Sequence, residues 1–219
     1  AQAAALLRAL DLDVPALGFV LSDAGVRTLA RLGTVPAVPK EMLEIWTTRY
    51  PNLDGAVPPP TTSLAALVEH DGRLGGAAGR VRTLRASLVL SNDEHAELRD
   101  VLDVLARIRE GWIGLGTAAR KRLAARAAFV EALRVLRADD PDRARAVASE
   151  VGALAADGVG LVPPPLVTGD HLVERGHRPG PMFKGVLDAA YDAQLEGAIK
   201  SLEEGILFAE RLLGGAARG

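Results

Sequence analysis

The strongest structural signal in the sequence is a capping box followed by an apolar stripe at helical spacing. Ser91-Asn92-Asp93-Glu94 has the pattern in which serine and glutamate side chains each accept a backbone N–H at a helix start. Five apolar residues then recur at intervals that place them on one helix face: Leu98, Val101, Leu102, Leu105 and Ile108. A strand would divide these side chains between two faces, so the segment predicts a helix that packs against a core.

Helix start and stop signals recur along the rest of the chain. They predict helices over residues 22–32, 39–50, 61–70, 80–89, 117–136, 140–158, 168–176, 182–196 and 201–213. No stretch shows sustained strand alternation, so we predict an all-α fold with a multi-helix body followed by a small helical tail. The boundaries expected from the sequence give a helical N-terminal region over 1–87, a helical body over 88–160 and a tail over 161–219. Proline-rich segments at 57–60 and 163–165 are further candidate boundaries.

Composition excludes several classes of protein. The chain has no cysteine, which excludes a disulfide scaffold, a thiolate zinc site and a cysteine nucleophile. Its apolar runs are shorter than the roughly 20 residues of a membrane-spanning helix, and we identify no signal peptide at its start. We therefore expect a cytoplasmic protein. Because the chain begins at Ala1 rather than at Met, we expect either a processed product or an excised fragment of a longer protein.

Positive charge is concentrated in the middle of the chain. Residues 73–137 hold 13 Lys and Arg against 7 Asp and Glu, whereas the remainder holds 13 against 21. Such a basic region is either a phosphate-facing surface or an ordinary solvated helix surface. Under the first interpretation the candidate contacts are Arg80, Arg82, Arg85, Arg107, Arg109, Arg120, Lys121, Arg122 and Arg126.

The last third of the chain carries an extended motif. It contains Pro163-Pro164-Pro165-Leu166-Val167-Thr168-Gly169-Asp170-His171-Leu172, then Gly176-His177-Arg178-Pro179-Gly180-Pro181, Gly185-Val186-Leu187 and Ala193-Gln194-Leu195-Glu196-Gly197. In order and spacing this run resembles the tail of bacterial CCA-adding enzymes and poly(A) polymerases, the tRNA nucleotidyltransferase family. The segment Leu88-Val89-Leu90-Ser91-Asn92-Asp93-Glu94 is similar to the opening of a body helix in the same family. The resemblance covers residues 88–213, whereas residues 1–87 show only sequence patterns that are typical of helices.

The resemblance implies an RNA-holding role rather than catalysis by this chain. In the family, a glycine turn that holds triphosphate and an Asp-x-Asp pair that holds Mg²⁺ lie in an N-terminal head built on a β-sheet. Asp11-Leu12-Asp13 has no preceding glycine turn, and Gly75-Gly76-Ala77-Ala78-Gly79-Arg80 is better interpreted as a flexible linker. We therefore expect no catalytic residue, no metal ligand and no cofactor in this chain, and we expect ATP or CTP to bind only in the absent head. The expected partner is tRNA or another RNA, with Arg178 and Lys184 of the tail as further candidate contacts.

Two other functions are kept as alternatives. His70-Asp71 has the dyad of a metal-dependent HD phosphohydrolase, but His70, His95, His171 and His177 supply no evident second ligand pair. We interpret the dyad as a helix end, or as the remnant of a degenerate HD site. The other alternative is a non-catalytic helical interaction module without RNA affinity.

Overall fold

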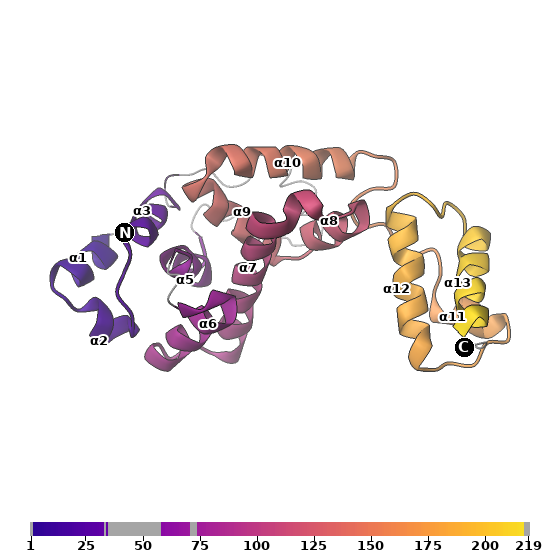
Figure 1. Cartoon of the computed structure of the whole chain (residues 1–219), viewed down its shortest axis with the longest axis horizontal. Helices are drawn as coiled ribbons and strands as arrows, with labels where there is room; N and C mark the ends of the chain where they lie inside the picture. The colour runs from indigo at the N-terminus through magenta and orange to yellow at the C-terminus, as the bar shows by residue number, and fades with distance from the viewer. Residues whose placement is uncertain (1, 33, 35–57, 71–73, 217–219) are drawn as a thin grey trace. The chain divides into compact units, whose positions relative to one another are not determined.

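The computed structural model describes residues 2–32, 34, 58–70 and 74–216, and within these ranges it contains helices and no strand. The predicted all-α fold is thus confirmed (Figure 1). The described elements are α1 (Gln2–Ala9), α2 (Asp13–Leu17), α3 (Asp23–Leu32), α5 (Pro60–Val68), α6 (Gly76–Ser87), α7 (Asn92–Gly111), the 3₁₀ turn η2 (Trp112–Gly114), α8 (Thr117–Ala124), α9 (Ala128–Asp139), α10 (Pro141–Ala155), α11 (Gly169–Glu174), α12 (Pro181–Leu195) and α13 (Leu202–Ala216).

The chain divides into two compact units. Unit 1 comprises residues 1–114 and 126–152, and unit 2 comprises residues 115–125 and 153–219. This division differs from the expected boundaries at 87/88 and 160/161. The reason is that α6 packs on α7 within unit 1, whereas α8 packs on α12 within unit 2.

The core of unit 1 is built around α7. All five side chains of the predicted stripe are fully buried. They pack between α5, α6 and α9, and α3 covers α5 and α9 in turn. Nearly every residue of α9 is buried, and its Phe129 ring lies 5.9 Å from the ring of Trp112 between centroids. The periodicity therefore identified the central helix of this unit.

Side-chain caps fix where three helices of unit 1 begin. The capping box at α7 is present, with Glu94 N donating to Ser91 Oγ at 3.2 Å and Ser91 N donating to Glu94 Oε2 at 2.8 Å. Ser22 Oγ accepts from Gly25 N at the start of α3, and Asp140 Oδ1 accepts from Arg143 N at the start of α10. Each of these starts agrees with the prediction from the sequence.

Other predicted helices differ from the structure. The helix expected over 117–136 is two helices, α8 and α9, separated at residues 125–127. Arg126 lies in this break and binds Asp100 and Asp103 of α7, so a tertiary contact overrides the helical propensity of the alanine-rich segment. Helix α6 begins at Gly76, four residues before the predicted start, and the helix expected over 39–50 lies outside the described residues.

Unit 2 is a smaller helical assembly around the tail motif. Val167, Leu172, Val186 and Ala209 form its buried cluster, with Phe183, Leu187 and Leu213 packed at the edge. These residues come from the segment before α11 and from α11, α12 and α13, so four successive parts of the tail share one core.

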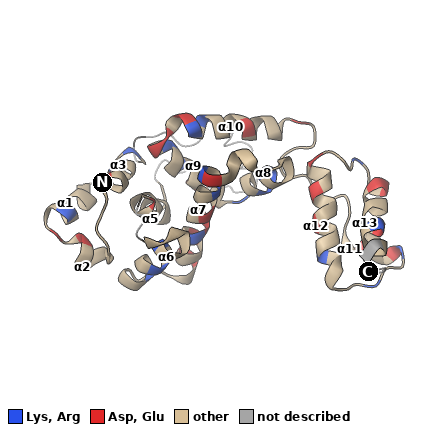
Figure 2. Cartoon of the chain, viewed as in Figure 1, with Lys and Arg blue, Asp and Glu red and all other residues tan. Residues whose placement is uncertain are grey.

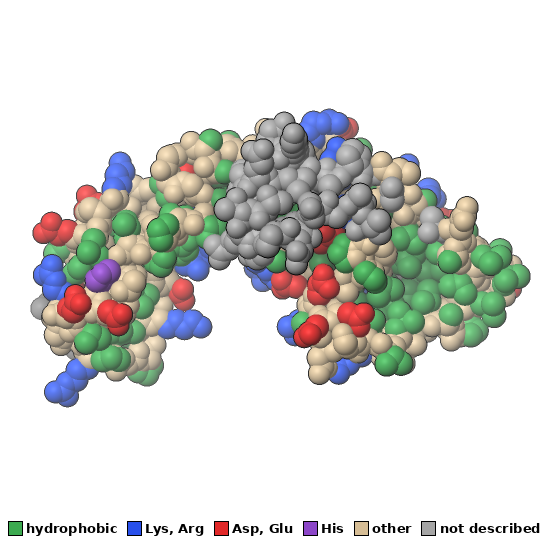
Figure 3. Space-filling view, turned by 180° about the vertical axis from the view of Figure 1, so that it is seen from behind, with side chains coloured by type: hydrophobic (Ala, Val, Ile, Leu, Met, Phe, Trp, Pro, Cys, Tyr) green, Lys and Arg blue, Asp and Glu red, His purple; other side chains and the backbone are tan. Residues whose placement is uncertain are grey.

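Some hydrophobic side chains lie on the surface. Figure 3 shows them gathered over α1 and α2, where the exposed large residues are Leu6, Leu10, Leu12 and Val14. None of the helices in the described part of the chain combines the length and the hydropathy needed to cross a membrane.

Candidate nucleic-acid interface

Helices α6 and α8 carry basic side chains and no acidic ones, as Figure 2 shows. From the sequence alone their arginines and lysine are candidate phosphate contacts. What each can bind depends on whether an acidic side chain from another helix already neutralises it. The eleven predicted cations differ in these partners.

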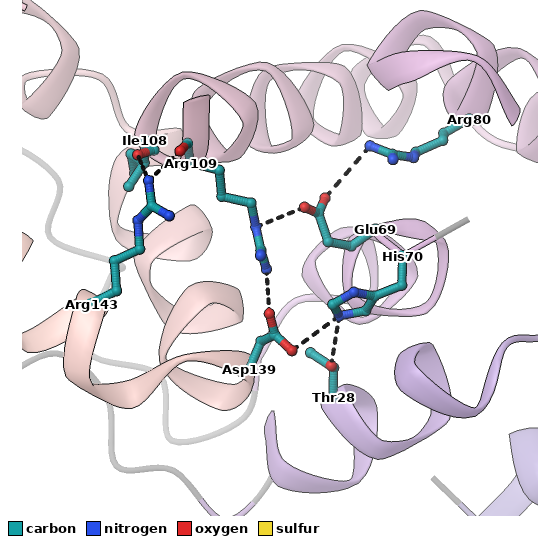
Figure 4. Close-up of polar contacts among 8 residues, drawn as sticks. All are labelled: Thr28, Glu69, His70, Arg80, Ile108, Arg109, Asp139 and Arg143. Atoms are coloured by element: carbon teal, nitrogen blue, oxygen red, sulfur yellow. Dashed lines mark hydrogen bonds and ion pairs between the residues drawn. The ribbon is translucent and has the colours of Figure 1, made fainter. Parts of the chain in front are cut away.

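Two of them, Arg80 and Arg109, face a carboxylate inside unit 1 (Figure 4). Glu69, at the end of α5, is almost fully buried, and its Oε1 lies 2.9 Å from Arg109 Nε. Its Oε2 lies 3.7 Å from Arg80 Nη1. Arg109 also donates from Nη2 to Asp139 Oδ2 at 2.7 Å. Both guanidinium groups are thus used in holding α5, α6, α7 and α9 together.

Burial changes the titration of two groups in this polar cluster. It raises the pKa of Glu69 above its ordinary value of 4.5, with Arg109 and Arg80 acting in the opposite direction. It lowers the pKa of His70 below its ordinary value of 6.5; Asp139 opposes this shift, and nearby arginines including Arg109 add to it. The cluster therefore favours a neutral imidazole beside its guanidinium groups.

The same cluster contains the histidine of the proposed HD dyad. His70 Nε2 lies 3.2 Å from Asp139 Oδ1 and 3.2 Å from Thr28 Oγ1 on α3. The other oxygen of Asp139 is held by Arg109 (Figure 4). Among the described residues no three His, Asp or Glu side chains gather at a point where they could hold a metal ion, and Asp71 lies outside those residues.

Two further predicted cations, Arg107 and Arg126, are paired along α7. Arg126 Nη1 donates to Asp103 Oδ2 at 2.7 Å, and its Nη2 binds Asp100. Arg107 Nε donates to the same Asp103 oxygen at 3.1 Å from one turn away. Arg126 therefore has a structural role at the start of α9, whereas Arg107 remains largely exposed.

In unit 2, Lys121 and Arg122 hold α8 against the tail. The Lys121 side chain is 0% exposed, and its Nζ lies 2.6 Å from Asp157 Oδ2. Arg122 donates from Nε to Asp192 Oδ1 at 2.5 Å, and its guanidinium carbon lies 5.0 Å from the centroid of the Tyr191 ring. The assignment of Lys121 to an RNA-facing surface is corrected here, because its ammonium group is inside the unit. Arg120, its neighbour, is half-buried and engaged in an interaction of its own.

Four predicted cations stay on the surface without a carboxylate partner among the described residues. Arg82 and Arg85 are exposed and lie three residues apart on α6, so they share one face in unit 1; Arg85 makes only a 3.4 Å hydrogen bond to Asn92. Arg178 and Lys184 are exposed in unit 2, on either side of Pro179-Gly180-Pro181. Arg175 is exposed beside them, a residue that the sequence analysis missed although it lies three positions before Arg178.

Side chains of α12 bind the proline-rich segment 163–166, which we call the strap. Gln194 Nε2 donates to Pro164 O at 2.8 Å, and Gln194 Oε1 accepts from Leu166 N at 2.9 Å. The Tyr191 hydroxyl donates to Pro163 O at 3.0 Å. The strap has few backbone hydrogen bonds of its own because proline lacks an N–H, so these side chains fix its position.

The turn into α12 contains one glycine in a left-handed conformation. Thr168 caps α11 and pairs with His171, whose Nδ1 accepts from Thr168 N at 3.2 Å. Gly176 ends that helix in a left-handed conformation with φ of 88°, which favours glycine. Gly180 has extended backbone with φ of −161° and ordinary contacts. The special backbone position is therefore Gly176.

The carboxylate pair Asp11 and Asp13 is not arranged around a shared site. Asp13 is buried at the start of α2, where its Oδ2 accepts from Leu21 N at 2.9 Å and its Oδ1 from Val14 N at 3.0 Å. Asp11 is exposed in the preceding turn.

Comparison of the chain with family models, with curated proteins and with solved structures gave no match.

Proposed function

We propose that this chain is the RNA-holding part of a tRNA nucleotidyltransferase or poly(A) polymerase, whose catalytic head lies outside the sequence described. The observation that supports this proposal most directly is the tail motif. Its polar residues hold a strap against α12 and leave Arg178 and Lys184 exposed on the two sides of a rigid turn. The proposed role of the chain is to bind RNA through its phosphate backbone and to position the RNA 3′ end, where the head adds C or A.

The physical chemistry of this turn suits phosphate binding. Pro181 is the first residue of α12, a 15-residue helix, and the dipole of this helix favours an anion at that end. Arg175, Arg178 and Lys184 add three exposed cations within ten residues of sequence. Contacts of this kind read the backbone without reading base sequence.

The test is a comparison of two double variants in a tRNA-binding titration. Arg178→Ala with Lys184→Ala removes two cations at the turn. Lys200→Ala with Arg211→Ala removes two exposed cations elsewhere in unit 2 and is the matched control. We expect the first variant to bind tRNA severalfold more weakly. The slope of log K against log salt concentration should become smaller in magnitude by about two. Equal affinity for both variants, or no binding by the unaltered chain at low salt, contradicts the proposal.

The same proposal predicts that the purified chain alone does not extend RNA. Incubation with labelled ATP or CTP, tRNA and Mg²⁺ measures this directly. Template-independent addition to the 3′ end by the 219-residue chain would contradict the assignment of catalysis to an absent head.

A further inference from the structure

A hollow of about 350 Å³ lies between the strap and α12 in unit 2. Its lining residues are Pro165, Val167, Thr168, Leu187, Asp188 and Tyr191. This volume is at the lower end of the roughly 300–1,000 Å³ of small-molecule pockets. The hydrogen bonds of Gln194 and Tyr191 to the strap fix both walls before any ligand binds.

The chemistry of the lining defines the kind of group that fits. Four residues offer apolar or aromatic surface, and Asp188 offers a carboxylate that is about half exposed, with Arg122 Nη1 3.8 Å from its Oδ1. A carboxylate repels a phosphate and accepts hydrogen bonds, so the hollow favours a flat, uncharged ring with N–H donors at its edge. The Tyr191 ring, which also has the Arg122 guanidinium carbon 5.0 Å from its centroid, adds aromatic surface on which a base can stack.

The position of the hollow on α12 connects it with the exposed cations. Lys184, Leu187, Asp188 and Tyr191 follow one another at helical spacing and share one face of the helix. Lys184 therefore lies about 6 Å along the axis from Asp188, one turn ahead of the hollow. A strand whose phosphates contact Arg178 and Lys184 would bring a neighbouring base to Asp188.

We infer that the hollow takes one unpaired nucleobase of the bound RNA, with guanine preferred. This inference rests on the proposed RNA-holding function and adds a base preference to it. Among the bases, guanine presents two adjacent donors, N1–H and N2–H, on the edge that meets the two oxygens of a carboxylate. Arg122 holds the main-chain oxygen of Asp188 at 3.0 Å from Nη2 and so orients this part of the helix.

The experiment compares two single-stranded RNA oligonucleotides, oligouridine with one central guanine and the same length with uridine only. We expect the unaltered chain to bind the guanine-containing oligonucleotide about tenfold more tightly, near the low end of discrimination by a paired contact. Asp188→Asn removes one charge and should abolish this ratio. Glu203→Gln removes one charge on an exposed side chain of α13 and should keep it.

A further variant tests the aromatic wall. Tyr191→Leu removes the ring and should lower affinity for the guanine-containing oligonucleotide severalfold, whereas Glu203→Gln should not. Equal binding of both oligonucleotides by the unaltered chain overturns the base pocket and leaves the RNA-holding function standing. Binding of neither oligonucleotide at low salt overturns both, and a guanine preference retained in Asp188→Asn overturns the assigned role of Asp188.

Discussion

At the scale of the residue, the role of a basic side chain depends on whether an acidic side chain lies next to it. Arg120, Lys121 and Arg122 are adjacent and look equivalent in the sequence. In the structure Lys121 is fully buried against Asp157, while Arg122 is part-exposed and bound to Asp192. Asp157 in turn accepts from Val159 N at 3.0 Å and Gly160 N at 3.1 Å with its other oxygen. Lys121 therefore fixes a loop at the start of the tail.

Replacing Lys121 is predicted to destabilise the protein rather than to change a surface. Lys121→Ala removes a buried alkyl chain and leaves Asp157 without its partner, so we expect a loss of about 2–3 kcal/mol in the free energy of unfolding. Denaturant titration followed by circular dichroism measures it. Arg82→Ala, on an exposed residue of α6, is the control and should change the free energy by less than about 0.5 kcal/mol. A similarly small change for Lys121→Ala would show that the pair contributes little.

His70 is predicted to make stability depend on pH. Its pKa is lower in the fold than its ordinary value of 6.5, so the folded state binds its proton less readily than the unfolded state does. The stability that this contributes is present above pH 6.5 and is lost as pH falls through the folded pKa. His70→Gln has no titrating group at this position. The decrease in denaturant midpoint from pH 7.5 to pH 5.5 should therefore be larger for the unaltered chain than for the variant. Equal decreases would mean that His70 does not govern this window.

At the scale of the element, the start of a helix could be predicted wherever its cap is local. Ser91, Asp140 and Thr168 each lie within three residues of the groups that they satisfy, so the sequence contains the whole interaction. The break between α8 and α9 could not be predicted in this way. It is set by Arg126, whose partners Asp100 and Asp103 precede it by more than 20 residues.

The turn between α11 and α12 gives a prediction with an internal control. Gly176 has φ of 88°, whereas Gly180 has φ of −161°, and neither has a close neighbour that a Cβ would meet. Gly176→Ala forces a side chain into the left-handed region and should cost about 1 kcal/mol of stability. Gly180→Ala occupies ordinary extended backbone and should cost much less. Thermal unfolding of the two variants decides it, and a larger loss for Gly180→Ala would contradict this account of the turn.

At the scale of the whole molecule, the uneven distribution of charge along the sequence largely disappears on folding. The basic residues 73–137 bind acidic residues inside that range, such as Asp100 and Asp103, and others outside it, such as Glu69, Asp139 and Asp157. Composition could therefore predict that the charges segregate in sequence, but not that they pair in space. It overestimates the surface that is available for phosphates, because ion-pair partners separated by 30 residues or more carry no local signal.

This pairing sets the salt dependence expected for RNA binding. If all eleven predicted cations contacted phosphates, the slope of log K against log salt concentration would be about −8 to −10. Among the described residues, Arg82, Arg85, Arg178 and Lys184 are exposed without a carboxylate partner, and with exposed Arg175 these five cations predict a slope of about −3.5 to −4.5. Fluorescence anisotropy of labelled tRNA over a series of salt concentrations measures the slope. A value near −9 would mean that the buried ion pairs open to release their arginines on binding, and that the pairing described for Arg80, Arg109, Arg122 and Arg126 belongs to the free protein alone.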